Sequence, residues 1–286
     1  MPPKATTTSA SSTAKVQSSS PAQQLTSLLK TQQFYWFLGH VFAILFFALS
    51  SLTAILFRHA ASLKYYRFTL LSIIVTYLIV LKQVYVKRSA PKVTPARLIR
   101  DENVQYLSLA VVFYIASYIL DNQAQTVLYS YIIFAVFHAL TYFQNNLLTI
   151  AIPSIPTQQR VNSAINNFTT QFNQPALSAA SSVEIVLAVM LAFDVLISTF
   201  WLLLKWNVVQ YATKVFLLVA VIVFNKLRYD NNQFTKAAVS QLDQTWNGYV
   251  NRLNNPQLTQ KYFGFREKII HYLALIQLPK PEKKTQ

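Results

Sequence analysis

Few ionisable side chains lie within the long apolar segments of this sequence, chiefly Glu184, Asp194, Lys214 and His138. A charge inside an apolar segment costs free energy, so such residues often mark ion pairs or proton pathways. Asp194 and Lys214 each stand ten residues from Leu204, which adjoins a tight turn. In an antiparallel helical hairpin both would lie about 15 Å from that turn, at the same depth. We therefore predict an ion pair between Asp194 and Lys214 that locks the hairpin, with a proton relay as the alternative.

The other two residues and the missing motifs argue against catalysis. Glu184 stands at the end of its apolar segment, so we expect it at the membrane–water interface. His138 has no His, Asp or Glu three or four residues away, so we expect it to hydrogen-bond to a neighbouring helix rather than ligate a metal. The chain has no cysteine, and it shows no HExxH, phosphate-loop or nucleophile-elbow pattern. The sequence predicts a non-enzymatic protein without a catalytic residue, metal site or cofactor.

The composition places the chain among membrane proteins. Of its 286 residues, 53% are hydrophobic and only 12% are charged, whereas soluble domains carry about a quarter charged residues. Apolar segments, most of them long enough to cross a bilayer, cover residues 34–57, 68–81, 104–120, 127–152, 183–204 and 208–224. The sequence therefore predicts an all-α membrane protein with about six hydrophobic helices, followed by cytosolic amphipathic helices. The shorter second and third segments could instead form partial hairpins.

Three regions follow from this pattern. Residues 1–30 are rich in Ser and Thr and poor in large apolar side chains, which favours a disordered tail. Residues 31–225 hold the apolar segments and form a multipass transmembrane bundle. Residues 226–286 form a cytosolic region of amphipathic helices with a basic end. No apolar run at the start of the chain resembles a signal peptide, so the first apolar segment is expected to act as an uncleaved anchor.

The distribution of positive charge indicates how the chain crosses the membrane. Its net charge is +16, and Lys and Arg accumulate on the cytosolic side of membrane proteins. If both termini are cytosolic, most of the 25 Lys and Arg residues lie on that side. The exceptions are Arg58, Lys64, Arg67 and Lys205, together with Lys214 inside a segment. Six crossings therefore fit, and four would keep the same ends. The sequon at Asn167 then faces the cytosol and stays unglycosylated.

Two amphipathic helices are predicted in the tail, on either side of a break at residues 254–256. The first covers residues 235–254 and the second residues 261–278. Apolar side chains gather on one face of each, and cations border the second face, as on helices that lie on membranes. The expected membrane-surface residues are Val239, Leu242, Trp246, Tyr249, Leu253, Lys261, Tyr262, Phe265, Arg266, Lys268, Ile269, Tyr272, Leu273 and Ile276. The alternative is that the helices pack on each other or on the cytosolic ends of the spans.

Two weaker signals lie elsewhere in the chain. Residues 157–182 carry apolar side chains at helical spacing, which favours a third interfacial helix; these are Val161, Ile165, Phe168 and Phe172. The chain ends in KKTQ, so Lys283 and Lys284 resemble the di-lysine signal that retrieves membrane proteins to the endoplasmic reticulum. Such a signal works only on a cytosolic C-terminus, which agrees with the charge distribution.

Three stretches carry a family resemblance: FHALTYFQNNLL (137–148), SSVEIVLAVMLAF (181–193) and VFNKLRYDNNQFTKAAVSQLD (223–243). In this order they resemble the family of fungal pore-membrane proteins and metazoan transmembrane protein 33, over about residues 36–278. The resemblance implies a membrane protein of the endoplasmic reticulum and nuclear envelope without known enzymatic activity. It further implies association with nuclear pore complexes, shaping of curved membrane, membrane binding by the C-terminal helices, and contact of that region with a nuclear import receptor.

These observations lead to one expected function and one alternative. The expected function is to shape or stabilise curved membrane and to support nuclear pore biogenesis or distribution. The expected partners are the bilayer with its anionic headgroups, nucleoporins, a nuclear import receptor and reticulon-like membrane-shaping proteins, but no nucleic acid. The alternative is a transporter or channel that uses Asp194 and Lys214. The chain has only three glycines, which argues against the alternative, since transporters use glycine for close helix contacts and broken helices.

Overall fold

The computed structural model describes residues 21–86 and 93–277, and every regular element in these ranges is helical. Six helices form a bundle: α2 (Gln32–Ile55), α3 (His59–Tyr85), α5 (Glu102–Ile119), α6 (Thr126–Tyr142), α8 (Ile155–Lys205) and α9 (Val208–Asn231). The shorter elements are α1 (Pro21–Leu29), α4 (Pro95–Arg100), the π-helix η1 (Phe143–Leu147) and α7 (Leu148–Ala151). Two tail helices follow, α10 (Gln233–Arg252) and α11 (Pro256–Ala274).

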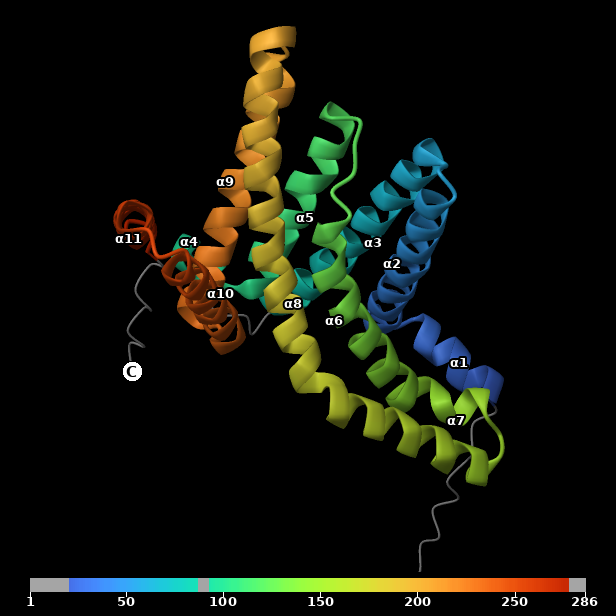
Figure 1. Cartoon of the computed structure of the whole chain (residues 1–286). Helices are drawn as coiled ribbons and strands as arrows, with labels where there is room; N and C mark the ends of the chain where they lie inside the picture. The colour runs from blue at the N-terminus through green and yellow to red at the C-terminus, as the bar shows by residue number, and fades with distance from the viewer. Residues whose placement is uncertain (1–20, 87–92, 278–286) are drawn as a thin grey trace, which may run out of the picture.

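The chain runs back and forth through the bundle. The turns that join α2 to α3, α5 to α6 and α8 to α9 lie at one end, and α1, α7 and α10 lie toward the other (Figure 1). Five helical stretches in the described residues are long and apolar enough to cross a membrane: α2, α3, Thr126–Ala151, α8 and α9. The shorter helix α5 also runs through the bundle, so the chain passes along it six times, and α1 and α10 lie toward the same end (Figure 1).

The expectation of about six hydrophobic helices, some of them partial hairpins, is corrected to five candidate spans in the described residues, because α5 is only 18 residues long and begins with polar side chains. Glu102 and Gln105 stand in its first turns, and its tyrosines lower its apolar content further. These groups face other helices: Tyr106 donates a hydrogen bond to Glu184 of α8, and Glu102 accepts one from Arg228 of α9. Polar groups that are satisfied inside a bundle need not meet lipid, so α5 fills the bundle between α3 and α9.

Three sequence boundaries also differ from the structure. Residues 21–29 of the expected disordered tail form α1, which contacts α2 and α7, and residues 1–20 lie outside the described range. The short second segment is part of a 27-residue helix, α3. Finally, α9 continues past the expected domain boundary at residue 225 to Asn231, because Arg228 is buried against α5 and α8 rather than exposed in a cytosolic linker.

The bundle is held by an apolar core and by polar pairs at its ends. Leu70, Phe113, Leu128 and Val221 are almost fully buried and join α3, α5, α6 and α9. Near the turn between α2 and α3, Ser50 and Ser62 donate hydrogen bonds to each other's backbone carbonyl at 2.9 and 2.8 Å. Hydroxyl groups inside a membrane protein need such partners, because lipid supplies none.

The long helix α8 bends once, so that it has two arms. Pro175 lies inside it, and a proline removes one backbone hydrogen bond and kinks a helix. The first arm runs along the base of the bundle and the second ascends beside α9 (Figure 1). Residues 157–182, expected as a separate interfacial helix, therefore belong to a continuous helix whose first arm packs on α6: the rings of Phe168 and Phe137 are 5.7 Å apart. Gln144 of η1 also donates to Asn162 and Asn166 of this arm.

Gly39 allows α2 and α3 to approach closely, which yields a stability prediction. A Cβ at this position would overlap the hydroxyl oxygen of Thr76. Overpacking a tight contact costs about 1–3 kcal/mol, so Gly39→Ala should lower the free energy of unfolding by that amount in thermal melts of the detergent-solubilised protein. Thr76→Ala should restore the stability of Gly39→Ala, because it removes the oxygen that the new Cβ would overlap. The lost hydroxyl donates only to the Ser72 carbonyl of its own helix, so no contact between helices is lost with it.

Gly264 of α11 supplies the matched control for this substitution. A Cβ there meets nothing within 4 Å. Gly264→Ala should therefore be neutral or slightly stabilising, since alanine is the better helix former. Equal melting curves for Gly39→Ala and Gly264→Ala would refute the close approach of α2 and α3.

Candidate functional site

The first tail helix is anchored to the bundle at its start. Asn232 caps α10 by accepting hydrogen bonds from the backbone N–H groups of Phe234 and Thr235. The Thr235 side chain is fully buried and donates to Ser181 of α8 at 3.3 Å. In this position α10 packs against both α8 and α9.

The apolar faces of α10 and α11 are only partly covered. Trp246 is 51% exposed on α10, and Phe265 and Tyr272 are 63% and 66% exposed on α11. The other exposed members of the predicted set are Tyr249, Leu253, Lys261, Lys268 and Ile269, and the half-buried members are Val239, Leu242, Tyr262, Arg266, Leu273 and Ile276. Each helix thus turns one edge of its apolar face toward protein and leaves the other uncovered. We name the uncovered side chains Trp246, Tyr249, Leu253, Phe265, Ile269 and Tyr272 the tail face.

One charged contact joins the two tail helices. The guanidinium of Arg266 donates two hydrogen bonds to the carboxylate of Asp243, each at 2.7 Å. This two-point geometry fixes the relative orientation of the groups as well as their distance. Arg266 was expected at the membrane-facing border of the second helix. Its head group instead ties α11 to α10.

This contact makes the docking of α11 sensitive to acid. The hydrogen bonds from Arg266 lower the pKa of Asp243 below its ordinary value, which is about 3.9. A carboxyl group whose pKa is lowered by folding contributes stability above its unfolded pKa and loses it as the pH falls through the folded value. We expect α11 to stay docked at neutral pH and to loosen only below about pH 3.9.

Amide hydrogen exchange along α11 measures this docking. Asp243→Asn should raise exchange in α11 several-fold at neutral pH and remove its acid dependence. Glu267→Gln, beside Arg266 in the same exposed helix, is the control and should leave exchange unchanged. Equal exchange in the Asp243→Asn variant and the unmodified protein would show that the contact does not hold the helix.

The structure brings Asp194 and Lys214 together in the upper part of the α8–α9 hairpin. The Lys214 ammonium lies 2.8 Å from the Asp194 carboxylate and donates a second hydrogen bond, also of 2.8 Å, to Ser198. The two side chains are 45% and 23% exposed for Asp194 and Lys214 respectively. The sequence predicted that Asp194 and Lys214 lie at one depth of the hairpin, and in the structure the two side chains form an ion pair. Whether the pair locks the hairpin in a membrane remains a prediction.

A second charged cluster, which the sequence reading missed, lies lower in the bundle. Glu184, expected at the interface, is 2% exposed. Its carboxylate accepts a 2.6 Å hydrogen bond from the Tyr106 hydroxyl and lies 3.5 Å from the guanidinium of Arg228. Arg228 is 3% exposed and also donates to Glu102 at 2.7 Å. This Glu184–Arg228 cluster therefore joins α5, α8 and α9 through two buried charges, Glu184 and Arg228, and the partly exposed Glu102.

Aromatic rings enclose the cluster. The Arg228 guanidinium lies 5.1 Å from the ring centre of Tyr106, within the range of a cation–π contact. Tyr77 stacks on Tyr106 at 5.9 Å, and the hydroxyl of Tyr131 donates to the backbone carbonyl of Tyr106 at 2.7 Å. The rings keep water from Glu184 and Arg228, so these two charges depend on their partners in the protein.

The same counting that paired Asp194 with Lys214 contains a signal for this cluster. Glu184 lies twenty residues before Leu204, and Arg228 lies twenty-four residues after it. In an antiparallel hairpin that offset is about one helical turn. The expected domain boundary at residue 225 hid this relation, because it assigned Arg228 to the cytosolic region rather than to the hairpin. Glu102 has no such signal, because it comes from another part of the chain.

The histidines are less isolated than their sequence positions suggest. The rings of His138 on α6 and His40 on α2 are 5.0 Å apart, and Trp36 lies beside both. The expected hydrogen bond from His138 to a neighbouring helix is replaced by ring contacts. Two histidines supply too few ligands for a closed metal site, and residues 21–86 and 93–277 contain no group of three metal-binding side chains.

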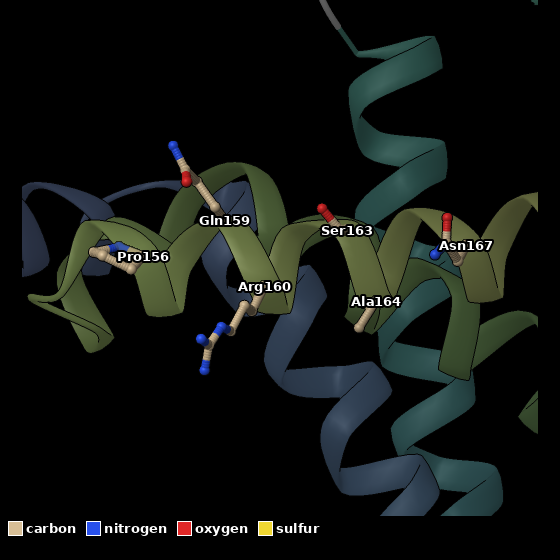
Figure 2. Close-up of a pocket in the computed structure, with 6 residues that line it drawn as sticks. All are labelled: Pro156, Gln159, Arg160, Ser163, Ala164 and Asn167. Carbon is tan, nitrogen blue, oxygen red and sulfur yellow. The ribbon is translucent and has the colours of Figure 1, made fainter.

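A shallow depression of about 510 Å³ lies on the first arm of α8 (Figure 2). It is lined from Pro156 to Asn167 by this helix alone. Gln159 and Asn167 point to one side of the helix, whereas Arg160 points to the other (Figure 2). Because these polar groups do not converge, we assign no ligand to the depression. Lys283 and Lys284, the expected retrieval signal, lie outside the described residues.

Comparison with known proteins decides the family. A family model described as Transmembrane protein 33/Nucleoporin POM33 matches residues 15–274, which is most of the chain and includes the bundle and both tail helices. This chain belongs to that family. The POM33 family is one of nuclear pore and endoplasmic reticulum membrane proteins and is not known as enzymatic.

Individual relatives of this POM33-family chain are fungal. It is 31% identical to Tetra-spanning protein 1 of Schizosaccharomyces pombe over 76% of this chain and 75% of that protein. It is 30% identical to the Pore and endoplasmic reticulum protein of 33 kDa of Saccharomyces cerevisiae, over 85% of this chain and 91% of that protein. It is also 26% identical to Nucleoporin POM33 of Chaetomium thermophilum, over 91% of this chain and 92% of that protein. No solved structure matches the chain.

Proposed function

We propose that this POM33-family protein stabilises curved membrane of the endoplasmic reticulum and nuclear envelope, and thereby supports the biogenesis or distribution of nuclear pores. The tail face carries the proposal. Its aromatic and aliphatic side chains are left uncovered by the bundle, while α10 is anchored beside the spans. A helix that inserts one apolar face among lipid headgroups widens one leaflet relative to the other, which favours curvature.

Tethering strengthens the proposed membrane contact. The tail helices follow α9, which is long and apolar enough to span a bilayer, so they are held near the membrane before they bind it. A tethered contact of this kind has a high effective concentration and needs little affinity of its own. The exposed cations Lys261 and Lys268 would lie near anionic headgroups, which attract such residues by about 1 kcal/mol each.

The proposed orientation places both termini in the cytosol. Its support is the charge distribution along the chain and the position of α1 and α10 toward the same end of the bundle (Figure 1). A four-crossing arrangement would keep the same ends, and one relative carries the name Tetra-spanning protein 1. In either arrangement the tail helices and the first arm of α8 face the cytosol.

Asn167 tests this orientation. It lies exposed on the first arm of α8 within a glycosylation sequon. Oligosaccharide is added only in the lumen, so we expect no mass shift on endoglycosidase treatment of the protein made in cells. A shift that Asn167→Gln abolishes would place this arm in the lumen and overturn the orientation.

The proposed partners follow the same arrangement. The bilayer and its anionic headgroups are the direct partner of the tail face. Nucleoporins, a nuclear import receptor and reticulon-like membrane-shaping proteins are proposed as protein partners, because they would meet the protein on curved membrane near pores. No nucleic acid is proposed, because the basic residues of the tail are scattered along two helices rather than clustered in a patch.

The experiment that tests the function is reconstitution of the full chain in vesicles of endoplasmic reticulum composition. We expect electron microscopy to show narrower or tubular vesicles with the unmodified chain, and round vesicles when residues 231–286 are removed. Solute flux measured on the same vesicles tests the alternative, a transporter that uses Asp194 and Lys214. Flux that Asp194→Asn abolishes, together with unchanged vesicle shape, would replace the proposed function by the alternative.

A further inference from the structure

A polar groove lies on the α8–α9 hairpin, near the turn that joins the two helices. It has a volume of about 250 Å³ and receives side chains from both helices. The turn lies at the end of the bundle opposite α10 (Figure 1). The groove and the tail face therefore belong to opposite sides of a membrane that the hairpin crosses.

The groove carries an excess of positive charge. Lys205 and Lys214 both line it. Lys214 is paired with Asp194 at 2.8 Å, which neutralises one of the two cations. The ammonium of Lys205 lies 5.0 Å above the ring of Trp201, a contact that positions the lysine and leaves its charge in place. The groove thus keeps one unneutralised positive charge at its open end.

Neutral polar groups and aromatic rings complete the groove. Gln210 and Tyr211 of α9 line it beside Lys205. Trp201 also lines the groove and is 49% exposed, and Trp206, in the turn between α8 and α9, is 79% exposed. Tryptophan and tyrosine gather at the level of lipid headgroups in membrane proteins. The mouth of the groove therefore has the composition expected at that level, and its polar side chains continue from there into the hairpin.

We propose that this groove binds the phosphate of a phospholipid with net negative charge, in the leaflet opposite the tail face. Lys205 supplies the charge, and the Gln210 amide and Tyr211 hydroxyl supply hydrogen bonds to the phosphate oxygens. Basic pockets beside membrane-spanning helices bind lipid headgroups in this way. The uncovered apolar side chains of Phe200 and Leu204, 63% and 60% exposed on the same hairpin, give the acyl chains an apolar surface. This site is separate from the tail face and does not depend on it.

Native mass spectrometry of the full chain in detergent, with phosphatidic acid as the probe, tests the site. Lys205→Gln should weaken retention of the lipid about fivefold, the effect of one lysine near a headgroup. Tyr211→Phe removes only a hydroxyl group and should also weaken retention. Lys64→Gln is the matched control, because Lys64 is an exposed lysine near the α2–α3 turn whose ammonium likewise lies over a ring, that of Phe68. It should leave retention unchanged.

Two further arms separate a lipid site from a general anion site. Phosphatidylcholine should be retained less well than phosphatidic acid, and inorganic phosphate should not displace the bound lipid. Equal retention of phosphatidic acid by the Lys205→Gln and Lys64→Gln variants would overturn the proposal. Displacement by inorganic phosphate would overturn it as well. Because all variants keep α10 and α11 intact, either result leaves the proposed function of the tail face untouched.

Discussion

A peptide of residues 233–277 becomes helical and binds vesicles that contain anionic lipid, and Trp246→Glu, Phe265→Glu and Tyr272→Glu together weaken this binding at least about a hundredfold. This is the first expected result. Each of these side chains is more than half exposed in the structure, and burying an aromatic or large aliphatic side chain contributes about 1.5–3 kcal/mol. The loss of three such contributions, together with repulsion between the new carboxylates and anionic lipid, lowers the vesicle affinity by more than a hundredfold. Circular dichroism and vesicle flotation measure the change.

A control with the same added charge separates apolar insertion from electrostatics. Gln241→Glu, Gln244→Glu and Asn251→Glu place three carboxylates on the exposed polar side of α10, away from Trp246. This variant should lose far less affinity than the tail-face variant. Equal losses would mean that charge alone governs binding and that the aromatic side chains do not enter the membrane.

Arg228→Met lowers the free energy of unfolding by about 3–5 kcal/mol, the second large effect that we expect. The guanidinium is 3% exposed and lies between Glu184 and Glu102. Removing one partner of a buried ion pair leaves the other charge without compensation, and that cost has this size. Glu184→Gln should restore much of the loss when combined with Arg228→Met, because the remaining amide can still accept the hydrogen bond from Tyr106. Thermal unfolding in detergent measures both variants.

Lys226→Met provides the matched control on the same helix. Lys226 pairs with Asp230, one turn further along α9. Pairs of this kind stabilise a helix by only about 0.2–0.5 kcal/mol. Loss of stability in Arg228→Met no greater than in Lys226→Met would show that the buried cluster does not hold α5, α8 and α9 together.

The sequence predicted the elements that depend on local pattern. The apolar runs were long enough to identify the bundle, and the break at Asn254–Pro256 separated the two tail helices, which the structure begins at Gln233 and Pro256. The tight turn after Leu204 brought Asp194 and Lys214 to one depth by counting alone. The span lengths and the depth count depend on the fixed rise of a helix, and the break depends on proline, so none of them varies with the surroundings.

What the sequence could not predict depends on contacts between distant segments. The contact between Arg228 and Glu102 is of this kind, because only the packing of α5 against α9 brings the two residues together. Arg266 likewise had the position of a lipid-facing cation, but Asp243, on another helix, takes up its hydrogen bonds. Periodicity identifies a face of a helix but not which neighbour covers it.

The position of the full-length protein in the nuclear envelope tests the central claim most directly. In cells that carry the tail-face variant with Trp246→Glu, Phe265→Glu and Tyr272→Glu, fluorescence microscopy should show a protein that is still inserted in the endoplasmic reticulum. It should no longer be enriched at the nuclear rim, and the nuclear pores should be unevenly distributed. The polar-side variant should behave as the unmodified protein. Unchanged rim enrichment and an even pore distribution in the tail-face variant would contradict the account and transfer the function to the membrane-spanning bundle.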